Sequence, residues 1–319
     1  MTKNTTSQWL NELHTNGVEL SVQELLRYQQ LTSLVNLAPK SAPQAQLSGA
    51  YLAKQKGRGM EFDEARHYQA GDDIRAIDWR VTARTGKTHT KIYREERERP
   101  VFILCDLTAS MQFGTQLLLK AVQAAHLTSL ISWSAAKRGD KVGALVFNDQ
   151  LHRECKPLSR KPAVLAICHE LLAVQKASNV GITPNIEGFA DACARVRRVA
   201  RPGSLVYLIS DFNHVSYAAT QHINHLSRHC EVQAMVVNDP LEQALPDVPL
   251  VQPVDVTDGQ QRQTWLLGDQ AQQHAYQQWR VKHTESVEQI FRQAKVKHQF
   301  ISAGMPLDEQ LGTRMGRKR

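Results

Sequence analysis

The segment VFILCDLTASM, residues 101–111, decides the fold class, because an apolar run ends at an acidic residue and two hydroxyl residues follow. The apolar run predicts a strand buried on both faces, as in a parallel sheet. Asp106 then lies at the carboxyl end of that strand, where open α/β sheets bind their ligands. Thr108 and Ser110 follow at alternate positions. The segment therefore predicts a mainly parallel sheet with polar side chains at one edge.

Outward from this segment, short apolar runs alternate with longer helical stretches, which is the pattern of βαβ units around a mainly parallel sheet. The expected strands cover residues 101–105, 142–147, 205–210, 231–237 and 299–302. The expected helices cover residues 116–137, 162–172, 184–199, 219–228 and 270–295. Residues 239–269 are expected to add a hairpin or edge strands. We therefore expect an α/β domain over residues 100–305, with helices flanking the sheet.

The rest of the chain differs from this domain in its polarity and charge. Residues 1–50 are polar, contain one amphipathic stretch over 22–37 that predicts a short helix, and form an expected N-terminal extension. Residues 51–99 are dense in both charges, contain an expected strand over 89–98, and predict a small β-rich arm. Residues 306–319 end in GRKR and are expected to form a basic C-terminal tail.

Composition restricts the class of protein without selecting a partner. Of 319 residues, 42% are hydrophobic and 22% are charged, as in globular proteins that fold around a core. These proportions argue against a disordered, collagen-like or coiled-coil chain. The formal net charge of +8 is compatible with an acidic protein, a nucleic acid or an anionic membrane surface, so charge alone does not choose among them.

Cysteine usage and the N-terminus indicate the compartment. The five cysteines are widely spaced and form no C-x-x-C pair, which argues against a disulfide framework and a zinc site. Cys105 is expected to point into the sheet packing as an inert thiol. The polar N-terminus lacks a signal-peptide core, and no apolar run reaches the roughly 18 residues that span a bilayer. We therefore expect a cytoplasmic protein without a transmembrane segment.

Further polar residues are expected at the same edge of the sheet. Thr183 lies in the loop GITPN, and Asp211 ends the apolar run LVYLISD. Carboxylates and hydroxyls are the ligands of hard cations such as magnesium, which keeps several waters. Each residue alone also has a structural explanation, because hydroxyl residues cap helices and carboxylates end strands.

In their order along the chain, D-x-T-x-S, G-x-T-P and a strand ending in S-D resemble the metal-ion-dependent adhesion site (MIDAS) of von Willebrand factor A domains. The segment RGDKVGALVF, residues 138–147, is similar to a turn and the second strand of that family. The resemblance implies a Rossmann-like fold and a site for Mg or another divalent cation such as Mn. Thr108 stands where the family more often has serine, and it retains the hydroxyl. The implied metal ligands are Asp106, Thr108, Ser110, Thr183 and Asp211.

The charged segment carries a second resemblance. It contains GRGMEF at residues 57–62, RHYQAGDDIRAIDW at residues 66–79 and YREERE at residues 93–98. These motifs resemble the domain-of-unknown-function family 58, whose members combine this signature with a von Willebrand A-like domain and commonly accompany MoxR-type AAA+ ATPases. The resemblance implies a MoxR-type ATPase as a partner and membrane-associated von Willebrand A proteins as companions, through which the protein would be peripheral to the inner membrane.

The opposite charges of the arm permit two interpretations. Arginine binds carboxylates in a bidentate manner, so a paired network that anchors the arm is the favoured one. The alternative is a partner-docking surface, since Arg, Trp and Tyr are enriched in interface hot spots. The pair Asp72-Asp73 follows a glycine and favours an Asx-type turn over a metal or catalytic pair. The candidate docking residues are Arg66, Tyr68, Asp72, Asp73, Arg75, Asp78, Trp79 and Arg84.

The preferred function is a non-enzymatic adaptor that works with the MoxR-type ATPase and binds an acidic partner residue through the metal. The main alternative is a magnesium-dependent phosphohydrolase of haloacid-dehalogenase type, because FILCDLT is similar to a strand that ends in a nucleophilic aspartate. That class needs a second carboxylate where this chain has Thr108. The absence of a G-x-x-x-x-G-K-[ST] loop argues against ATP hydrolysis by the chain itself.

Nucleic-acid binding is a third interpretation, based on Arg195, Arg197, Arg198 and Arg201. Basic residues near a helix C-terminus also complement the helix dipole, which is the simpler explanation. Aromatic residues are not interleaved with these arginines, as base-stacking platforms would require. We therefore expect no nucleic-acid partner.

Overall fold

The computed structural model describes residues 6–38, 60–95, 99–178, 184–257 and 262–315. The chain separates into two compact units. The main unit consists of Met1–Leu37 and Arg99–Arg319, and the arm consists of Ala38–Glu98. The described candidate metal ligands lie in the main unit, and the candidate docking residues lie in the arm.

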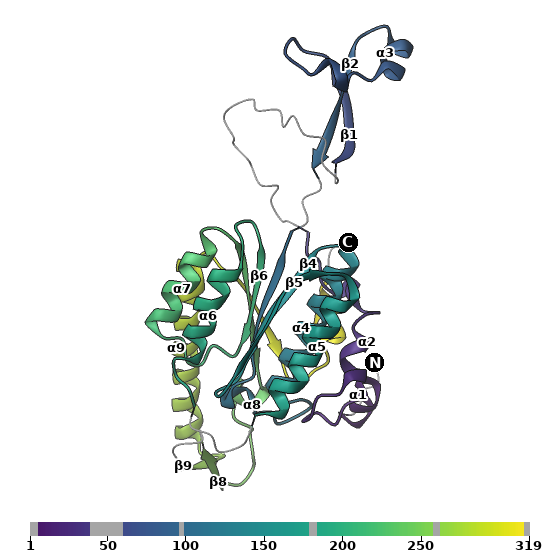
Figure 1. Cartoon of the computed structure of the whole chain (residues 1–319). Coiled ribbons are helices and arrows are strands. Elements are labelled where there is room, and N and C mark those ends of the chain that lie inside the picture. The colour runs from purple at the N-terminus through teal and green to yellow at the C-terminus, as the bar shows by residue number, and fades with distance from the viewer. Residues whose placement is uncertain (1–5, 39–59, 96–98, 179–183, 258–261, 316–319) are drawn as a thin grey trace. The chain divides into compact units, whose positions relative to one another are not determined.

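A six-stranded sheet forms the centre of the main unit (Figure 1). Its order is β10-β7-β6-β3-β4-β5, and every described pairing is parallel except that of β4 with β5. The bounds are β3 Val101–Asp106, β4 Lys141–Phe147, β5 His152–Ser159, β6 Leu205–Ser210, β7 Glu231–Asn238 and β10 Lys297–Ser302. The prediction of an α/β fold with a mainly parallel sheet is therefore confirmed.

Helices cover both faces of this sheet (Figure 1). Alternate residues of β3 explain the two layers, because Ile103 packs in one hydrophobic cluster and Phe102 and Leu104 pack in the other. The first cluster includes α4 Lys120–Arg138 and α5 Arg160–Lys176. The second includes α6 Gly188–Val199, α7 Tyr217–Ser227 and α9 Gln270–Gln293.

The central strands β3 and β6 are neighbours, and the chain leaves them in opposite directions. After β3 it passes through α4 to β4, whereas after β6 it passes through α7 to β7. This is the topological switch point of an open α/β sheet, where a crevice forms beyond the carboxyl ends of the strands. The strand order therefore places Asp106 and Asp211 at that crevice.

Strand β5 is present in the structure but was not among the strands predicted from the sequence. It forms an edge of the sheet, so most of its side chains are at least partly exposed and its sequence lacks an apolar run. Its pairing with β4 is irregular between Val142 and Ala144. A Cβ at Gly143 would lie 2.7 Å from the carbonyl oxygen of Cys155, so this close approach requires glycine.

Helix α4 begins at Lys120, later than the expected start at residue 116. The amides of Leu118 and Leu119 donate to the carbonyl oxygens of Ala303 and Gly17 instead of forming a first helical turn. These long-range bonds hold the preceding segment outside the helix. The start of α4 is therefore decided by tertiary contacts, and it places a lysine at the first helical position.

The N-terminal segment packs on the main unit. Its elements are α1 Thr6–Leu13, α2 Val22–Arg27 and η1 Thr32–Leu34. Leu25 and Tyr28 are fully buried in the same cluster as α4. Part of the range 1–50, expected to be an extension, thus contributes to the core.

The C-terminal range 306–319 was expected to be a basic tail, and it includes a helix. Helix α10, Leu307–Met315, places Leu307 and Leu311 in the core of the main unit. Two leucines one helical turn apart bury enough apolar surface to fix the segment, despite the basic residues that follow.

Residues 239–269 contain the hairpin expected from the sequence. Its strands, β8 Gln252–Thr257 and β9 Arg262–Leu267, pair in an antiparallel manner. The short helix α8 Pro240–Gln243 precedes the hairpin, and α9 begins soon after it (Figure 1).

In the arm, β1 Met60–His67 pairs with β2 His89–Glu95 in an antiparallel manner. Between them lie η2 Ile74–Ala76 and α3 Trp79–Thr85. Helix α3 ends at Gly86, whose φ of 70° favours glycine. The described part of the arm is therefore a β-hairpin whose connection contains short helical segments, and residues 96–98 of the expected strand lie outside the described residues.

Candidate functional site

The candidate site begins where β3 and β6 end. Asp106 is 4% exposed and Asp211 is 7% exposed, so both carboxylates are buried at the crevice. The hydroxyl of Ser210 donates to Oδ2 of Asp106 at 2.6 Å, which links the ends of the two strands. Apolar residues along both strands place these carboxylates, because the strands are buried over their full length.

The loop after β3 folds back on Asp106. Oδ1 of Asp106 accepts hydrogen bonds from the Thr108 amide at 2.9 Å and from the Thr108 hydroxyl at 2.7 Å. The hydroxyl oxygens of Thr108 and Ser110 lie 3.4 Å apart. Thr108 precedes the short helix η3 Ala109–Met111 but makes no side-chain capping bond to it. Its hydroxyl is thus directed to the carboxylate, so capping does not explain its position.

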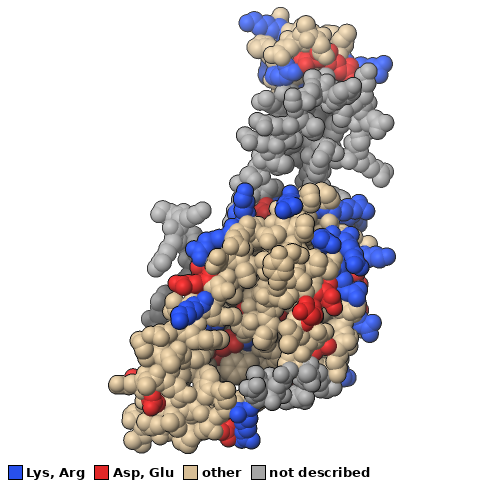
Figure 2. All heavy atoms as spheres, turned by 90° about the vertical axis from the view of Figure 1, so that its left-hand side faces the viewer, with Lys and Arg blue, Asp and Glu red and all other residues tan. Residues whose placement is uncertain are grey.

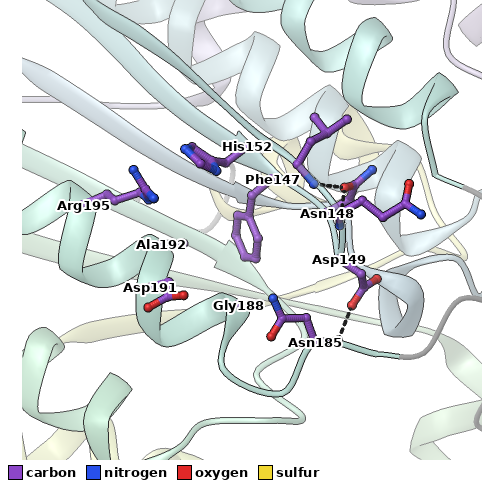
Figure 3. Close-up of a pocket in the computed structure, with 11 residues that line it drawn as sticks. Phe147, Asn148, Asp149, His152, Asn185, Gly188, Asp191, Ala192 and Arg195 are labelled. Carbon is purple, nitrogen blue, oxygen red and sulfur yellow. Dashed lines mark hydrogen bonds between the residues drawn. The ribbon is translucent and has the colours of Figure 1, made fainter.

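Asp149, which follows β4, connects two loops of the site. Its Oδ2 accepts from the Ala109 amide at 2.7 Å. Its Oδ1 accepts from the Asn185 amide at 2.8 Å (Figure 3). The second bond also helps to explain why α6 begins at Gly188 and not at residue 184. Sequence reasoning did not select Asp149, although it follows an apolar strand as Asp106 and Asp211 do. That shared position was the available signal.

Thr183 lies outside the described residues, so its place at the site stays an implication of the resemblance. The residues that follow it, Pro184 and Asn185, line the same cleft as Asp106 and Asp211. The described residues that follow Thr183 therefore reach this edge of the sheet.

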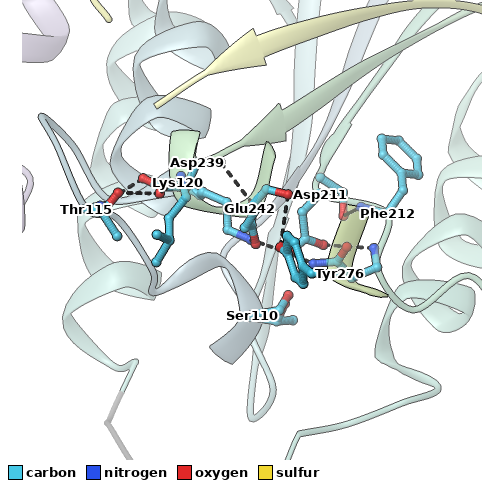
Figure 4. A network of polar contacts seen from close by, with 12 residues as sticks. Ser110, Thr115, Lys120, Asp211, Phe212, Asp239, Glu242 and Tyr276 are labelled. Atoms are coloured by element: carbon cyan, nitrogen blue, oxygen red, sulfur yellow. Dashed lines mark hydrogen bonds and ion pairs between the residues drawn. The ribbon is translucent and has the colours of Figure 1, made fainter. Parts of the chain in front are cut away.

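A buried ion-pair network adjoins the carboxylates (Figure 4). The ammonium of Lys120 lies 2.9 Å from Oδ2 of Asp211 and 2.5 Å from Oε1 of Glu242. Beside it, Asp239 accepts from the amide and the hydroxyl of Thr115, at 2.8 Å and 2.5 Å. Sequence reasoning missed Lys120 and Glu242, because they come from α4 and α8 and share no motif with the strand ends.

The two central carboxylates have opposite electrostatic environments. Burial and the neighbouring Asp211 raise the pKa of Asp106 to about 6. Burial would also raise the pKa of Asp211, but the Lys120 ammonium outweighs it and holds that pKa below its ordinary value. The hydroxyl of Ser110 acts on Asp211 in the same direction. Asp211 thus has a cationic partner, whereas the described contacts of Asp106 are all with neutral donors.

These residues form the floor of a cleft of about 620 Å³. Its carboxylates are Asp106, Asp149, Asp211, Glu242 and Asp255. Its aromatic residues are Phe113, Phe189, Trp265 and Tyr276. Trp265 of β9 and Tyr276 of α9 contact edge to face, with ring centroids 5.5 Å apart, so the hairpin and α9 form one wall. A cleft of this size admits a protruding side chain or a peptide segment.

The donor atoms at the floor fit a hard cation. Two carboxylates and the hydroxyls of Thr108, Ser110 and Ser210 offer only oxygen, the element that Mg²⁺ prefers. Across the part of the chain that the structure describes, no three His, Cys, Asp or Glu side chains are grouped so that they could hold a metal ion by themselves. A cation at this site would therefore be held by two carboxylates and hydroxyls together, and such oxygen ligands suit Mg²⁺ or Mn²⁺.

The family model for DUF58, described as a protein of unknown function, matches residues 64–286. This chain belongs to the DUF58 family. Uncharacterized proteins Rv1480 of Mycobacterium tuberculosis (strain H37Rv) and Mb1516 of Mycobacterium bovis are each 31% identical over 205 residues. The match covers 63% of this DUF58 chain and 62% of each relative.

Three solved structures resemble parts of the DUF58 chain. BatB from Bacteroides thetaiotaomicron has a TM-score of 0.38 at 14% identity, covering 69% of this chain and 100% of that one. An aerotolerance-related membrane protein from Bacteroides fragilis has a TM-score of 0.41 at 15% identity, covering 67% and 96%. A von Willebrand factor type A structure from Catenulispora acidiphila has a TM-score of 0.27 at 12% identity, covering 47% and 35%. Among its described residues, the DUF58 chain has no helix of the length and hydrophobicity needed to cross a membrane.

Three of the four arginines of the basic cluster of the DUF58 protein lie away from the cleft, whereas Arg195 lines a neighbouring cavity with Asp149 and Asn185. Arg197 and Arg198 occupy the last turn of α6, and Arg201 precedes the amino end of β6. Asp106 lies at the opposite, carboxyl edge of the sheet. In Figure 2, most Lys and Arg side chains on the visible face of the main unit lie in its upper half. The position of Arg197 and Arg198 matches the helix dipole, which favours cations at a helix C-terminus.

In the arm, the acidic candidate residues support the local fold. Asp72 accepts from Arg66 at 2.7 Å and from the Gln69 amide at 2.9 Å. Asp73 accepts from the Arg75 amide at 3.0 Å and caps η2. These contacts assign the acidic pair to turns.

The remaining candidate docking residues divide by exposure. Asp78 is buried and accepts from the first amides of α3, at 3.0 and 3.2 Å. Tyr68 is half-buried, and Arg75 and Arg84 are exposed. Trp79 is 67% exposed. Among the candidate docking residues, the tryptophan and the two exposed arginines are therefore side chains that a partner can reach.

Proposed function

We propose that this DUF58 protein is a non-enzymatic adaptor that binds a divalent cation between the ends of β3 and β6 and offers it to an acidic residue of a partner. One observation carries the proposal. The Asp106 carboxylate is buried beside Asp211, and its described hydrogen bonds come from Thr108 and Ser210, which are neutral. A second cationic charge would offset the burial of this carboxylate.

The residues that would hold the cation are Asp106, Thr108, Ser110 and Asp211, with Thr183 added by the resemblance to a MIDAS. A bound magnesium ion supplies positive charge that a carboxylate can bind directly. The cleft above these residues gives a partner side chain access. An acidic residue on a protruding loop is the partner chemistry that fits.

A MoxR-type AAA+ ATPase is the proposed partner, with membrane-associated von Willebrand A proteins as further companions. The support is membership of DUF58, whose signature commonly accompanies such ATPases. The proposed setting is the cytoplasm, peripheral to the inner membrane through these partners. The exposed Trp79, Arg75 and Arg84 of the arm offer a second contact surface for the same assembly.

The first experiment measures cation binding by isothermal titration calorimetry of the full chain with MgCl₂ and MnCl₂. Asp106→Ala should abolish binding while circular dichroism shows an intact fold. Asp255→Asn is the matched control, because Asp255 lines the same cleft but pairs with Arg262 within the hairpin. Equal binding by wild type and Asp106→Ala would contradict the site.

The second experiment tests the adaptor role. A MoxR-type ATPase should be retained by the immobilised protein in Mg²⁺ and released by EDTA, and Asp106→Ala should not retain it. Hydrolysis of p-nitrophenyl phosphate in Mg²⁺ provides the opposing test. Turnover that Asp106→Ala abolishes would favour the phosphohydrolase alternative and overturn the non-enzymatic assignment.

A further inference from the structure

Lys120 occupies a position that is unfavourable for an ammonium group. It is the first residue of α4, and its side chain is 1% exposed. The N-terminus of a helix carries partial positive charge, which disfavours a cation. Burial disfavours it further. A charged lysine is retained here only if neighbouring carboxylates compensate for both effects.

Two carboxylates supply that compensation, and one of them belongs to the cation site. Asp211 lies 2.9 Å from the Lys120 ammonium, and Glu242 lies 2.5 Å from it. The ring of Phe113 covers the ammonium at 5.9 Å. A cation that binds Asp211 would therefore lie close to a fixed positive charge of the protein itself.

We propose that Lys120 regulates the cation site: its ammonium competes with the divalent cation for Asp211, and Glu242 retains the ammonium when the cation binds. This inference rests on the cation site of the proposed function. Two positive charges that share the Asp211 carboxylate repel each other in a buried environment, so Lys120 lowers the affinity of the site. Glu242 limits that effect, because its carboxylate offsets part of the ammonium's positive charge.

Glu242 also connects Lys120 to the wall of the cleft. The carboxylate accepts from the Asp239 amide at 2.9 Å, which fixes α8. The backbone carbonyl of Glu242 accepts from the Tyr276 hydroxyl at 3.0 Å, and Tyr276 contacts Trp265 of the hairpin. A change in the pairing of Lys120 is thus transmitted to the surface that would face a partner, and Trp265 reports it.

The test compares Mg²⁺ affinity by calorimetry in variants whose effects have opposite signs. Lys120→Met removes the competing charge and should raise the affinity about tenfold or more. Glu242→Gln leaves Lys120 with Asp211 as its ionic partner and should lower the affinity. A merely structural role would predict weaker binding in both variants. The double variant Lys120→Met with Glu242→Gln removes one charge of each sign and should bind more tightly than wild type, even if Lys120→Met alone does not fold.

Tryptophan fluorescence provides the second readout. Mg²⁺ should change the emission of wild type, and Trp265→Phe should remove that change without abolishing binding. Unchanged or weaker affinity in the folded Lys120→Met or double variant would overturn the inference. If Asp106→Ala abolishes binding at the same time, the cation site stands and only the role of Lys120 fails. If neither wild type nor the lysine variants bind Mg²⁺, the proposed function fails with the inference.

Discussion

The Nε2 atom of His126 lies 3.0 Å from the Glu24 carboxylate, and both side chains are fully buried. The pair joins α2 to α4, across 102 residues of sequence. The other ring nitrogen of His126 lies 3.0 Å from the Tyr28 hydroxyl. This network fastens the N-terminal segment to the main unit through polar contacts as well as through the core.

We predict that Glu24→Gln reduces the free energy of unfolding by about 2 kcal/mol at pH 7, because it removes a buried, charge-assisted bond. Burial acts to raise the pKa of Glu24, but the hydrogen bond and charge of His126 outweigh it and hold that pKa below its ordinary value of 4.5. The stabilisation is therefore complete above pH 4.5 and is lost as the pH falls through the folded-state value. Urea unfolding between pH 3 and pH 7 measures it.

Tyr28→Phe is the control for this prediction. It removes the hydroxyl contact to His126 and keeps the carboxylate, so the acid dependence of unfolding should match wild type. A difference between wild type and Glu24→Gln that stays constant down to pH 3 would contradict the role of the Glu24 charge.

Asp149→Ala should loosen the two loops that reach the candidate metal centre. The variant should retain the fold but bind Mg²⁺ at least about tenfold more weakly, because the Ala109 and Asn185 amides lose their shared acceptor. Hydrogen–deuterium exchange should be faster in both loops. Asp191→Ala is the control, since this exposed carboxylate lines the neighbouring cavity of about 80 Å³ but makes neither bond (Figure 3). Equal Mg²⁺ affinity in the Asp149 variant and wild type would exclude a positioning role.

The cysteines should react slowly with thiol reagents in the native protein. Burial raises the pKa of Cys105 to about 12 and that of Cys168 to about 11. Burial, and after it the charge of Glu170, raise the pKa of Cys155 to about 11. Cys155 is half-buried, whereas the other four cysteines are buried. Ellman's reagent at pH 8 should label Cys155 first and all five after unfolding in urea. Rapid labelling of Cys105 without unfolding would contradict its burial.

Trp79→Ala should separate partner binding from arm stability. The side chain is 67% exposed, so its removal should change the stability of the arm by less than about 0.5 kcal/mol while reducing retention of the ATPase. Asp78→Ala should act mainly on stability instead. It should destabilise the arm by about 1 kcal/mol, because α3 loses its N-cap. Undiminished ATPase retention by Trp79→Ala would show that the arm binds elsewhere or has a structural role alone.

Much of the fold follows from local sequence patterns. The runs at Val101–Asp106 and Leu205–Ser210 are apolar up to their last residue, so each specifies a strand buried on both faces wherever it lies in the sheet. The polar residues after those runs then predict the edge at which a ligand binds. The edge strand β5 carried no such signal, because its exposed positions impose no requirement for apolar residues.

The sequence by itself determined the α/β class, the DUF58 signature and the carboxylate–hydroxyl pattern that includes Asp106 and Asp211. These are local properties, set by side-chain periodicity and by residues that follow a strand directly. The tertiary structure alone decided that Lys120 pairs with both Asp211 and Glu242, and that Asp149 joins two loops. The physical reason is that partners separated by 91 and 122 residues meet only when packing places α4, α8 and the end of β6 together.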